Sequence, residues 1–577
     1  MSASANNTSS GSSKPQNVDD ALRPETFKTP GLTLDGLEIP LLAKNALRHF
    51  AILSYKQESP CFWVAFIGGT GTGKSTLFNA FCNKPLSATG VERPKTAGAV
   101  AYTHRHCSLE QAFPFSEIKL EPMVLEEIGI PYAGKPGRLT IIDSGEQIAS
   151  HLVLVDTPDL DSVEEQNHRI AKDLYDLSDA VVFVASQEKY ADEVLHNFLM
   201  KVLKDRKPCF FVLNKASLET TREEILKALQ TRGLDIHGSR LWLIPHTSPG
   251  IYDKIAEQRS FTRLKDSFFQ AFAKEQARNQ RAIAHTRAIK RLKKDLARVQ
   301  ELLARETHAA EAWLRQLEEM THQASLAYLH DQKERFSKTS SQYLSAEIRK
   351  LFSRYDLLAK PRRFVREIMT APLRITGLYK KKNSADRQAG LLKVQENVAF
   401  APIQETLSKY NRSVLLKLSP AEETSPLFKA LRDPDLALTE EETRHYILEA
   451  QEDLAQWLEE TFEALSKGIS KKKKLGIHST SILWGILIVT FNVVVGGGFT
   501  MLDAALDSAL GPFVTKGAVE VFAYHEIRKI ARELAKRYQE GLQSILHRQE
   551  DRYIACLKNL MTPDETVTAM KTLSKNL

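Results

Sequence analysis

A short glycine-rich stretch near residue 70 constrains this chain more than any other feature. Gly68, Gly73, Lys74 and Ser75 satisfy the pattern G-x-x-x-x-G-K-[ST]. The stretch lies between an apolar run, "FWVAFI", and a helix-like run, "STLFNAFC", which is the strand–loop–helix context that the motif requires. Backbone N–H groups of such a loop surround phosphates, so we expect nucleotide contacts from Gly68, Gly69, Thr70, Gly71, Thr72, Gly73, Lys74, Ser75 and Thr76.

Two further segments supply candidate ligands for Mg²⁺ and the terminal phosphate. The run "LVLVDTPDLDS" ends an apolar strand on Asp156, which is placed to hold Mg²⁺ through a water molecule. Between the two motifs, "RPKTAG" supplies Thr96, whose hydroxyl and carbonyl can close over the metal and the phosphate. We therefore expect a metal site of Ser75, Thr96 and Asp156, with Lys74 and Thr96 as catalytic candidates. The side chains of Lys74 and Ser75 should point to the ligand and not into the core.

Apolar runs define two regions of different architecture. Between residues 62 and 248, runs such as "AVVFVAS", "CFFVLN" and "LWLIPHTS" alternate with helix-like segments, as in a mostly parallel sheet buried on both faces. After about Ala256 long helical patterns dominate. One apolar stripe runs from Ile289 to Met320, interrupted only by Glu306, and another runs from Ile527 to Ile545. Two such stripes fit antiparallel members of a bundle, or two ordinary core helices.

The composition indicates the kind of partner and the cellular compartment that suit this chain. The net charge of +8 fits an anionic partner such as phospholipid or RNA. Five scattered cysteines form no closely spaced framework, so neither a disulfide scaffold nor a zinc site is expected and a reducing cytosol is the simplest interpretation. The Ser- and Asn-rich first twenty residues are expected to form a disordered tail.

These motifs resemble the large GTPases of the dynamin superfamily and their bacterial dynamin-like relatives. The match covers the stretch from Pro40 to Ser248 by motif, with Arg93, Pro94 and Thr96 matching the first switch. In the second switch, Asp159 stands where the family usually has glycine, which puts switch motion and hydrolysis rate in question. The resemblance implies GTP and Mg²⁺ as ligands.

The resemblance also implies a base-recognition motif after the "CFFVL" strand. Asn214 and Lys215 match it, but Ser217 replaces the carboxylate that accepts two hydrogen bonds from guanine, so guanine selectivity is expected to be weaker. Thr247 and Ser248 lie where the family closes the base pocket, although a plain turn fits them equally well.

Two segments are candidates for membrane contact. The run from Leu475 to Leu502 carries no charged residue apart from a possible proton on His478, and it follows four lysines, Lys471 to Lys474. We expect it to dip into one leaflet of an anionic membrane, with a buried helical hairpin as the alternative. The segment from Lys360 to Lys382 is basic and amphipathic, which suits a head-group region, a solvated helix face or RNA.

The expected architecture is therefore an α/β P-loop GTPase domain followed by a long helical stalk with an apolar membrane-interacting tip. The expected segments are a disordered tail (1–30), an N-terminal helix (31–58), the GTPase domain (59–255), a helical bundle (256–470), the apolar segment (471–525) and returning helices (526–577). The function expected is GTP hydrolysis that drives membrane remodelling or tethering, with self-assembly, on the cytoplasmic face of a membrane. A ribosome- or RNA-associated GTPase and a nucleotide-gated adaptor with little hydrolysis remain alternatives, and nucleic acid is not the expected partner.

Overall fold

The structure is a computed structural model that describes residues 22–335, 401–468 and 521–577. Within the first range, 90–97, 105–106, 108, 124–133, 144–149, 163, 188–191, 218, 235, 237 and 247–251 are left out. The chain divides into two compact units. Leu41–Val299 and Thr568–Leu577 form most of the first, here called the α/β unit, whereas Glu25–Pro40 and Gln300–Val567 form the second, the helical unit.

The α/β unit is built on an eight-stranded sheet with the order β3-β4-β2-β5-β1-β6-β7-β8. All neighbouring strands are parallel except β2 and β5. The strands are β1 (Phe62–Gly68), β2 (Ala99–Thr103), β3 (Lys119–Met123), β4 (Arg138–Asp143), β5 (Leu152–Asp156), β6 (Ala180–Ser186), β7 (Cys209–Ala216) and β8 (Leu241–Pro245). The expected mostly parallel sheet is confirmed, and the three strands β2, β3 and β4 were not foreseen.

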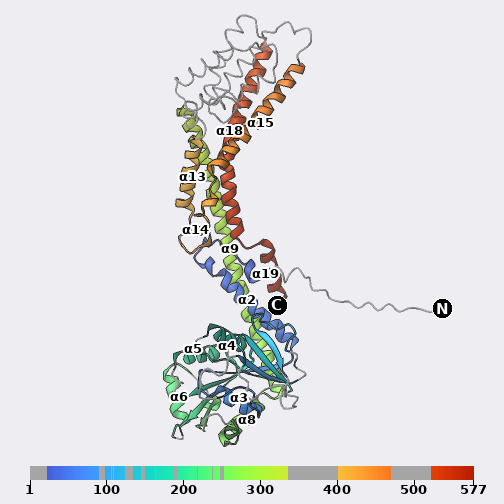
Figure 1. Cartoon of the computed structure of the whole chain (residues 1–577), viewed down its shortest axis with the longest axis vertical. Helices are drawn as coiled ribbons and strands as arrows, with labels where there is room; N and C mark the ends of the chain where they lie inside the picture. The colour runs from blue at the N-terminus through green and yellow to red at the C-terminus, as the bar shows by residue number, and fades with distance from the viewer. Residues whose placement is uncertain are drawn as a thin grey trace, which may run out of the picture. The chain divides into compact units, whose positions relative to one another are not determined.

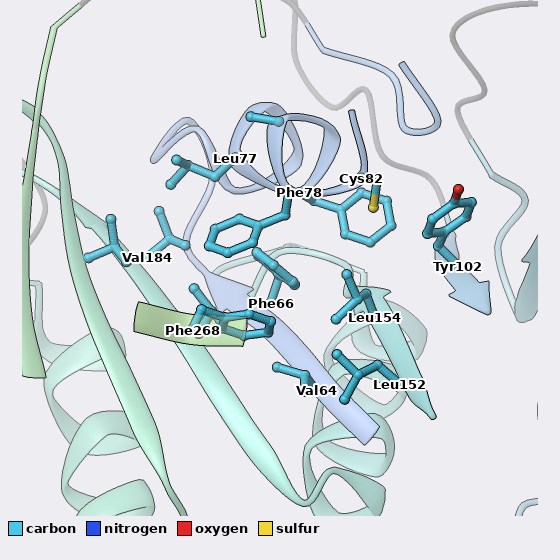
Figure 2. Close-up of a cluster of buried hydrophobic side chains, with 14 of the residues drawn as sticks. Val64, Phe66, Leu77, Phe78, Cys82, Tyr102, Leu152, Leu154, Val184 and Phe268 are labelled. Carbon is cyan, nitrogen blue, oxygen red and sulfur yellow. The ribbon is translucent and has the colours of Figure 1, made fainter. Parts of the chain in front are cut away.

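Helices cover both faces of this sheet. They are α2 (Ile39–Glu58), α3 (Lys74–Cys82), α4 (Glu165–Leu177), α5 (Glu193–Asp205), α6 (Arg222–Thr231), α7 (Tyr252–Ala256), α8 (Arg259–Ala271) and the first part of α9 (Lys274–Arg335). Alternate side chains of β1 enter different clusters: Val64 and Phe66 pack with α3 and α8, whereas Ala65 and Ile67 pack with α4 and α5. Figure 2 shows Phe66 beneath Phe78 of α3, with Phe268 of α8 beside it. Burial on both faces explains why β1 is apolar throughout.

The α/β unit extends further along the chain than the expected boundary at residue 255. Phe261, Leu264, Phe268, Phe272 and Ala277 belong to the same core cluster as β1. Within the expected N-terminal helix (31–58), α2 begins at Ile39, and its Ile52 and Tyr55 pack with Trp63. A helix that follows the last strand can still pack on the sheet and complete its core. The sequence pattern of α8 does not differ from that of the later helices, so the boundary of the unit could not be placed from the sequence.

Among the described residues of the helical unit, four helices run beside one another. They are the later part of α9, α13 (Ala401–Leu418), α15 (Glu440–Gly468) and α18 (Val521–Leu560) (Figure 1). Shorter elements are η2 (Asp35–Glu38), α14 (Pro426–Ala430), η8 (Pro434–Leu436) and α19 (Asp564–Asn576), which continues into the α/β unit. Trp313 and Leu317 of α9 pack with Tyr553 of α18, whereas Tyr328 packs with Leu542, so the two helices are antiparallel. The helices that carry the two apolar stripes do belong to one bundle, which α13 and α15 share. The first part of the α9 stripe, Ile289 to Val299, belongs to the α/β unit instead, so only its later part lies in this bundle.

Glu306, the residue that interrupts the first stripe, anchors the N-terminal segment Thr29–Gly36. Its carboxylate is buried, with 3% exposure, and accepts hydrogen bonds from Thr29 Oγ1 (3.1 Å), Leu32 N (3.1 Å), Thr33 N (2.6 Å) and Thr33 Oγ1. Gly36 packs so closely that a Cβ there would lie 2.1 Å from Glu306 Oε1. The chain is therefore ordered before residue 30, and Phe27 is buried.

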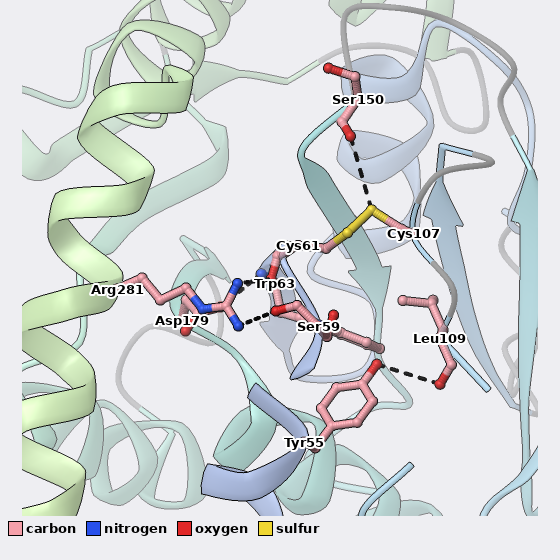
Figure 3. The surroundings of a disulfide bond; sticks show 9 residues. All are labelled: Tyr55, Ser59, Cys61, Trp63, Cys107, Leu109, Ser150, Asp179 and Arg281. Carbon is pink, nitrogen blue, oxygen red and sulfur yellow. Dashed lines mark hydrogen bonds between the residues drawn. A yellow bond between two sulfur atoms is a disulfide. The ribbon is translucent and has the colours of Figure 1, made fainter. Parts of the chain in front are cut away.

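One disulfide bond contradicts the expectation that the cysteines are unpaired. Cys61, directly before β1, is bonded to Cys107, which follows β2 (Figure 3). The two residues lie 46 positions apart, so no short sequence spacing marks the pair. Strands β1 and β2 lie on either side of β5 in the sheet, and this arrangement, which only the tertiary fold reveals, brings the two cysteines together. Cys82, Cys209 and Cys556 are free thiols.

Both candidate membrane segments, 360–382 and 475–502, lie outside the described residues. None of the helices in the described ranges is long and apolar enough to cross a bilayer.

Candidate nucleotide site

The glycine-rich loop joins β1 to α3 in the geometry expected of a phosphate-binding loop. Gly73, the residue before α3, has φ +83°, and a Cβ there would lie 2.2 Å from Asn214 Nδ2. Only glycine fits such a position without strain. Because the loop ends at the N-terminus of α3, the backbone N–H groups of that first turn are available to an anion. Ser75 and Thr76 lie in this turn.

The base-recognition motif holds the loop from the end of strand β7, which β6 separates from β1. Asn214 Nδ2 donates to the Thr72 carbonyl oxygen at 2.9 Å, and Lys215 Nζ donates to that of Gly71 at 2.7 Å. Within the loop, Thr72 Oγ1 donates to the Gly69 carbonyl oxygen at 2.8 Å. The structure thus brings together the two motifs that the sequence placed about 140 residues apart.

Lys74 lies among acidic groups. Its side chain is 2% exposed, and Nζ lies 2.7 Å from Asp156 Oδ1 and 3.7 Å from Asp159 Oδ1, and also donates to the Thr157 carbonyl oxygen. Burial lowers the pKa of Lys74, but the carboxylates of Asp156 and Asp159 together raise it by more. The pKa therefore lies above its usual value. The expectation that Lys74 points away from the core therefore does not hold here, because Lys74 neutralises buried carboxylates.

Asp156 is positioned by residues that the sequence analysis missed. It is fully buried, and its Oδ2 accepts a hydrogen bond from Ser87 Oγ at 2.7 Å. Asn79 of α3 fixes Ser87 in turn, since Asn79 Oδ1 accepts from Ser87 N at 2.9 Å and Nδ2 donates to the Ser87 carbonyl oxygen at 2.8 Å. A polar Asn within the apolar run "STLFNAFC" was the available signal for this support.

The second switch also places a carboxylate on the phosphate-binding loop. Asp161 Oδ1 accepts hydrogen bonds from Thr70 N and Thr70 Oγ1, both at 2.6 Å. Burial raises the pKa of Asp159, and the nearby Asp156 and Asp161 raise it further, against the lowering effect of Lys74. Leu160 is buried. Acidic groups of the second switch thus contact the lysine and a backbone N–H that phosphates would otherwise engage.

Other predicted site residues are less constrained by the structure. Ser217 is exposed, its N donates to Gln187 Oε1 at 2.8 Å, and its Oγ accepts from Glu219 N at 3.3 Å. Thr96, Thr247 and Ser248 lie outside the described residues, so their expected roles stay predictions.

These residues fit a nucleoside triphosphate with Mg²⁺. The cradle of loop amides and Lys74 suits the phosphates, while the Ser75 hydroxyl and the Asp156 carboxylate are oxygen ligands of the kind that Mg²⁺ prefers. Binding requires Lys74 and Thr70 to exchange their carboxylate partners for phosphate oxygens. Fold and site together define a P-loop GTPase domain.

Comparisons with known proteins agree with this class. Residues 63–215 match the profile of a family described as 50S ribosome-binding GTPase. A protein of Caldicellulosiruptor sp. (strain Rt8B.4), named only as an uncharacterized protein in the xynA 3' region, is 30% identical over 176 residues, which are 30% of this chain and 44% of that protein. The chain thus matches less than half the length of this curated relative.

Solved structures of bacterial dynamins are also similar. One, from an oligomerised bacterial dynamin pair described as sensing and tethering membranes, is 14% identical with a TM-score of 0.28, covering 83% of this chain and 81% of its own. Another, the LeoA bacterial dynamin GTPase from ETEC, is 14% identical with a TM-score of 0.24, covering 94% of this chain and 98% of its own. In this chain a P-loop GTPase domain is followed by long antiparallel helices.

Ser217→Asp should increase the preference for GTP over ATP. The carboxylate would restore two acceptors for guanine, each worth about 1.5–3 kcal/mol, so the affinity ratio should rise at least about tenfold. Competition binding with both nucleotides measures this ratio, with Ser217→Asn as a control that adds size without charge. An unchanged ratio would mean that the base lies elsewhere.

Proposed function

We propose that this protein binds and hydrolyses GTP with Mg²⁺ and uses the nucleotide cycle to change the conformation of helices associated with an anionic membrane. The main support for GTP binding is the contact of Asn214 and Lys215 with the phosphate-binding loop. Through this contact the proposed base-recognition motif at the end of β7 is joined to the loop that would bind the phosphates. Within the site, Lys74 binds phosphate oxygens, and Ser75, Asp156 and Thr96 are the proposed metal ligands. Bound Mg²⁺ would offset the negative charge of the phosphates.

The second switch supports a link between nucleotide state and conformation. Asp161 contacts Thr70 and Asp159 contacts Lys74, and phosphates would compete for both groups. Nucleotide binding therefore displaces the 156–161 segment from its present contacts. We propose that this displacement is the conformational signal, and that self-assembly on the membrane amplifies it.

Turnover measurements test this function. GTP and ATP hydrolysis should be followed with and without liposomes that contain anionic lipid. Preferential GTP hydrolysis that rises on liposomes supports the proposal, whereas tight GTP binding with negligible turnover in both conditions supports a nucleotide-gated adaptor. The acidic groups at Asp159 and Asp161 favour this second candidate, because they oppose the approach of a phosphate.

A ribosome-associated GTPase is the third candidate, favoured by the description of the family that residues 63–215 match. The match covers only the nucleotide-binding part of the chain. Co-sedimentation with ribosomal subunits at physiological salt, in the presence of GTP, would support this candidate, and co-flotation with liposomes would support the membrane proposal.

Replacing Ile486, Ile488 and Val489 with Asp should release the protein from anionic liposomes. Each carboxylate adds a burial cost of about 2.5–3.5 kcal/mol at depth in the bilayer. Flotation at low and high salt measures binding. A matched control places Asp at Gln230, Ser408 and Thr568, which are exposed helix positions, so the change in net charge is the same. Equal flotation of both variants would remove this segment from the mechanism.

A further inference from the structure

A cavity of about 450 Å³ lies in the α/β unit, at the end of the sheet opposite the phosphate-binding loop. It borders the chain just before β6, β7 and β8, whereas the loop follows the carboxyl end of β1. Helices α2 and α9 form its other walls. Arg281 of α9 connects these walls, since its guanidinium donates to the carbonyl oxygens of Lys56, Ser59 and Cys61. Figure 3 shows Arg281 beside Ser59 and Cys61.

The lining of this cavity is predominantly basic. Seven lysines and arginines line it, against three aspartates. The basic residues are Lys56, Arg206, Lys207, Arg240, Arg281, Arg287 and Arg291. A cavity with this lining has a positive potential, which its walls concentrate.

The three aspartates are already engaged. Asp179 accepts from Lys56 Nζ at 2.6 Å and from Trp63 N at 2.9 Å. Asp176 pairs with Arg48 at 2.8 Å and with Lys201 at 3.0 Å, neither of which lines the cavity. Asp205 accepts from Tyr175 OH at 2.8 Å and pairs with Arg291 at 3.3 Å. These carboxylates therefore leave most of the positive charge of the lining uncompensated.

Three arginines carry this surplus. Arg206, Arg240 and Arg287 are exposed, and none of them forms an ion pair with a carboxylate in the described part of the chain. Arg287 donates to the Arg206 carbonyl oxygen at 3.2 Å, which places two of the three next to each other. Guanidinium groups bind phosphate through paired N–H donors.

Two titratable groups in the lining have lowered pKa values, with burial as the largest cause of each. Burial and the nearby Lys56 ammonium lower the pKa of Lys207 to about 7, although its Nζ also donates to the carbonyl oxygens of Asp176 (3.2 Å) and Ser178 (2.7 Å). Burial and Arg291 lower the pKa of His49. An anion in the cavity would stabilise the protonated form of both.

We propose that this cavity binds an organic phosphate of about nucleotide size. Arg206, Arg240 and Arg287 contact the phosphate oxygens. The apolar side chains Ile52, Leu53 and Ile283, which also line the cavity, accept the uncharged part of the molecule. The volume lies within the range of about 300–1,000 Å³ that is usual for small-molecule sites.

Isothermal titration with inorganic pyrophosphate tests the site. The cavity variant is Arg240→Gln with Arg287→Gln, and the matched control is Lys290→Gln with Lys294→Gln, which removes the same charge from exposed positions of α9 outside the cavity. The wild type and the control should each bind one pyrophosphate that the cavity variant does not bind, or that the cavity variant binds at least about tenfold more weakly. This difference does not depend on whether pyrophosphate also enters the phosphate-binding loop, so it stands or falls separately from the proposed GTPase function.

Two organic probes then distinguish the source of the ligand. Ribose 5-phosphate has a polar body, as a soluble metabolite does, and short-chain phosphatidic acid has an apolar body, as a lipid does. Displacement of pyrophosphate from the cavity by either probe supports the site and identifies the class. Equal stoichiometry and affinity in all three proteins, or a pyrophosphate site that neither organic probe displaces, would overturn the proposal.

Discussion

Lys74→Ala is expected to abolish nucleotide binding and also to destabilise the α/β unit. The loss of two charge-assisted hydrogen bonds to phosphate, at about 1.5–3 kcal/mol each, weakens binding at least a hundredfold. The stability effect arises because the variant leaves Asp156, which is fully buried, without its cation. Removing one partner of a buried ion pair costs about 3–5 kcal/mol. Nucleotide titration and denaturant unfolding of the same preparations measure the two effects.

Two further variants separate these effects. Lys215→Ala removes an exposed lysine that donates to the Gly71 carbonyl oxygen, so it should weaken nucleotide binding with little change in the free energy of unfolding. Adding Asp156→Asn to Lys74→Ala removes the unpaired charge and should recover part of the lost stability without restoring binding. If Lys74→Ala unfolds at the wild-type denaturant concentration, the ion pair of the ligand-free structure is not formed in solution.

Glu306→Ala should release the N-terminal segment Thr29–Gly36 from the helical unit. Four hydrogen bonds to the carboxylate are lost, and the N–H groups of Leu32 and Thr33 lose their acceptor, so we expect the free energy of unfolding to fall by about 3 kcal/mol or more. Hydrogen exchange measures the release directly, as faster exchange in residues 29–36.

Glu301→Ala is the matched control on the same helix. Glu301 is half exposed and pairs with Arg305 four residues along, so its loss should cost less than about 0.5 kcal/mol. Unchanged exchange in residues 29–36 of Glu306→Ala would show that other contacts suffice, such as Ser425 Oγ to the Pro30 carbonyl oxygen at 2.7 Å.

The sequence predicts the centre of the sheet and the nucleotide loop because these depend on local patterns. Strands buried on both faces are continuous apolar runs, and the loop is one contiguous motif. The edge strand β3, "KLEPM", is half exposed and contains proline, so its pattern does not differ from that of a loop. Contacts between distant segments, such as Asp161 with Thr70 and Ser87 with Asp156, depend on the path of the chain through the fold.

Glu306 could have been recognised from the sequence. A carboxylate at a core position of an otherwise apolar stripe must find donors, because burying it without them is costly. The periodicity locates this position but cannot identify the partner, because Leu32 lies 274 residues earlier in the chain and no local pattern links the two.

The disulfide between Cys61 and Cys107 closes a covalent ring around the whole phosphate-binding loop. The closed segment, residues 61–107, contains β1, α3 and the segment that carries Thr96. In the chain-entropy model, closing a loop of this size restricts the unfolded chain by about 4 kcal/mol. The phosphate-binding loop thus lies within a covalently closed segment, whereas Asp156, Asn214 and Lys215 lie outside it, so the thermal stability of the α/β unit depends on whether thiol reductants can open this bond.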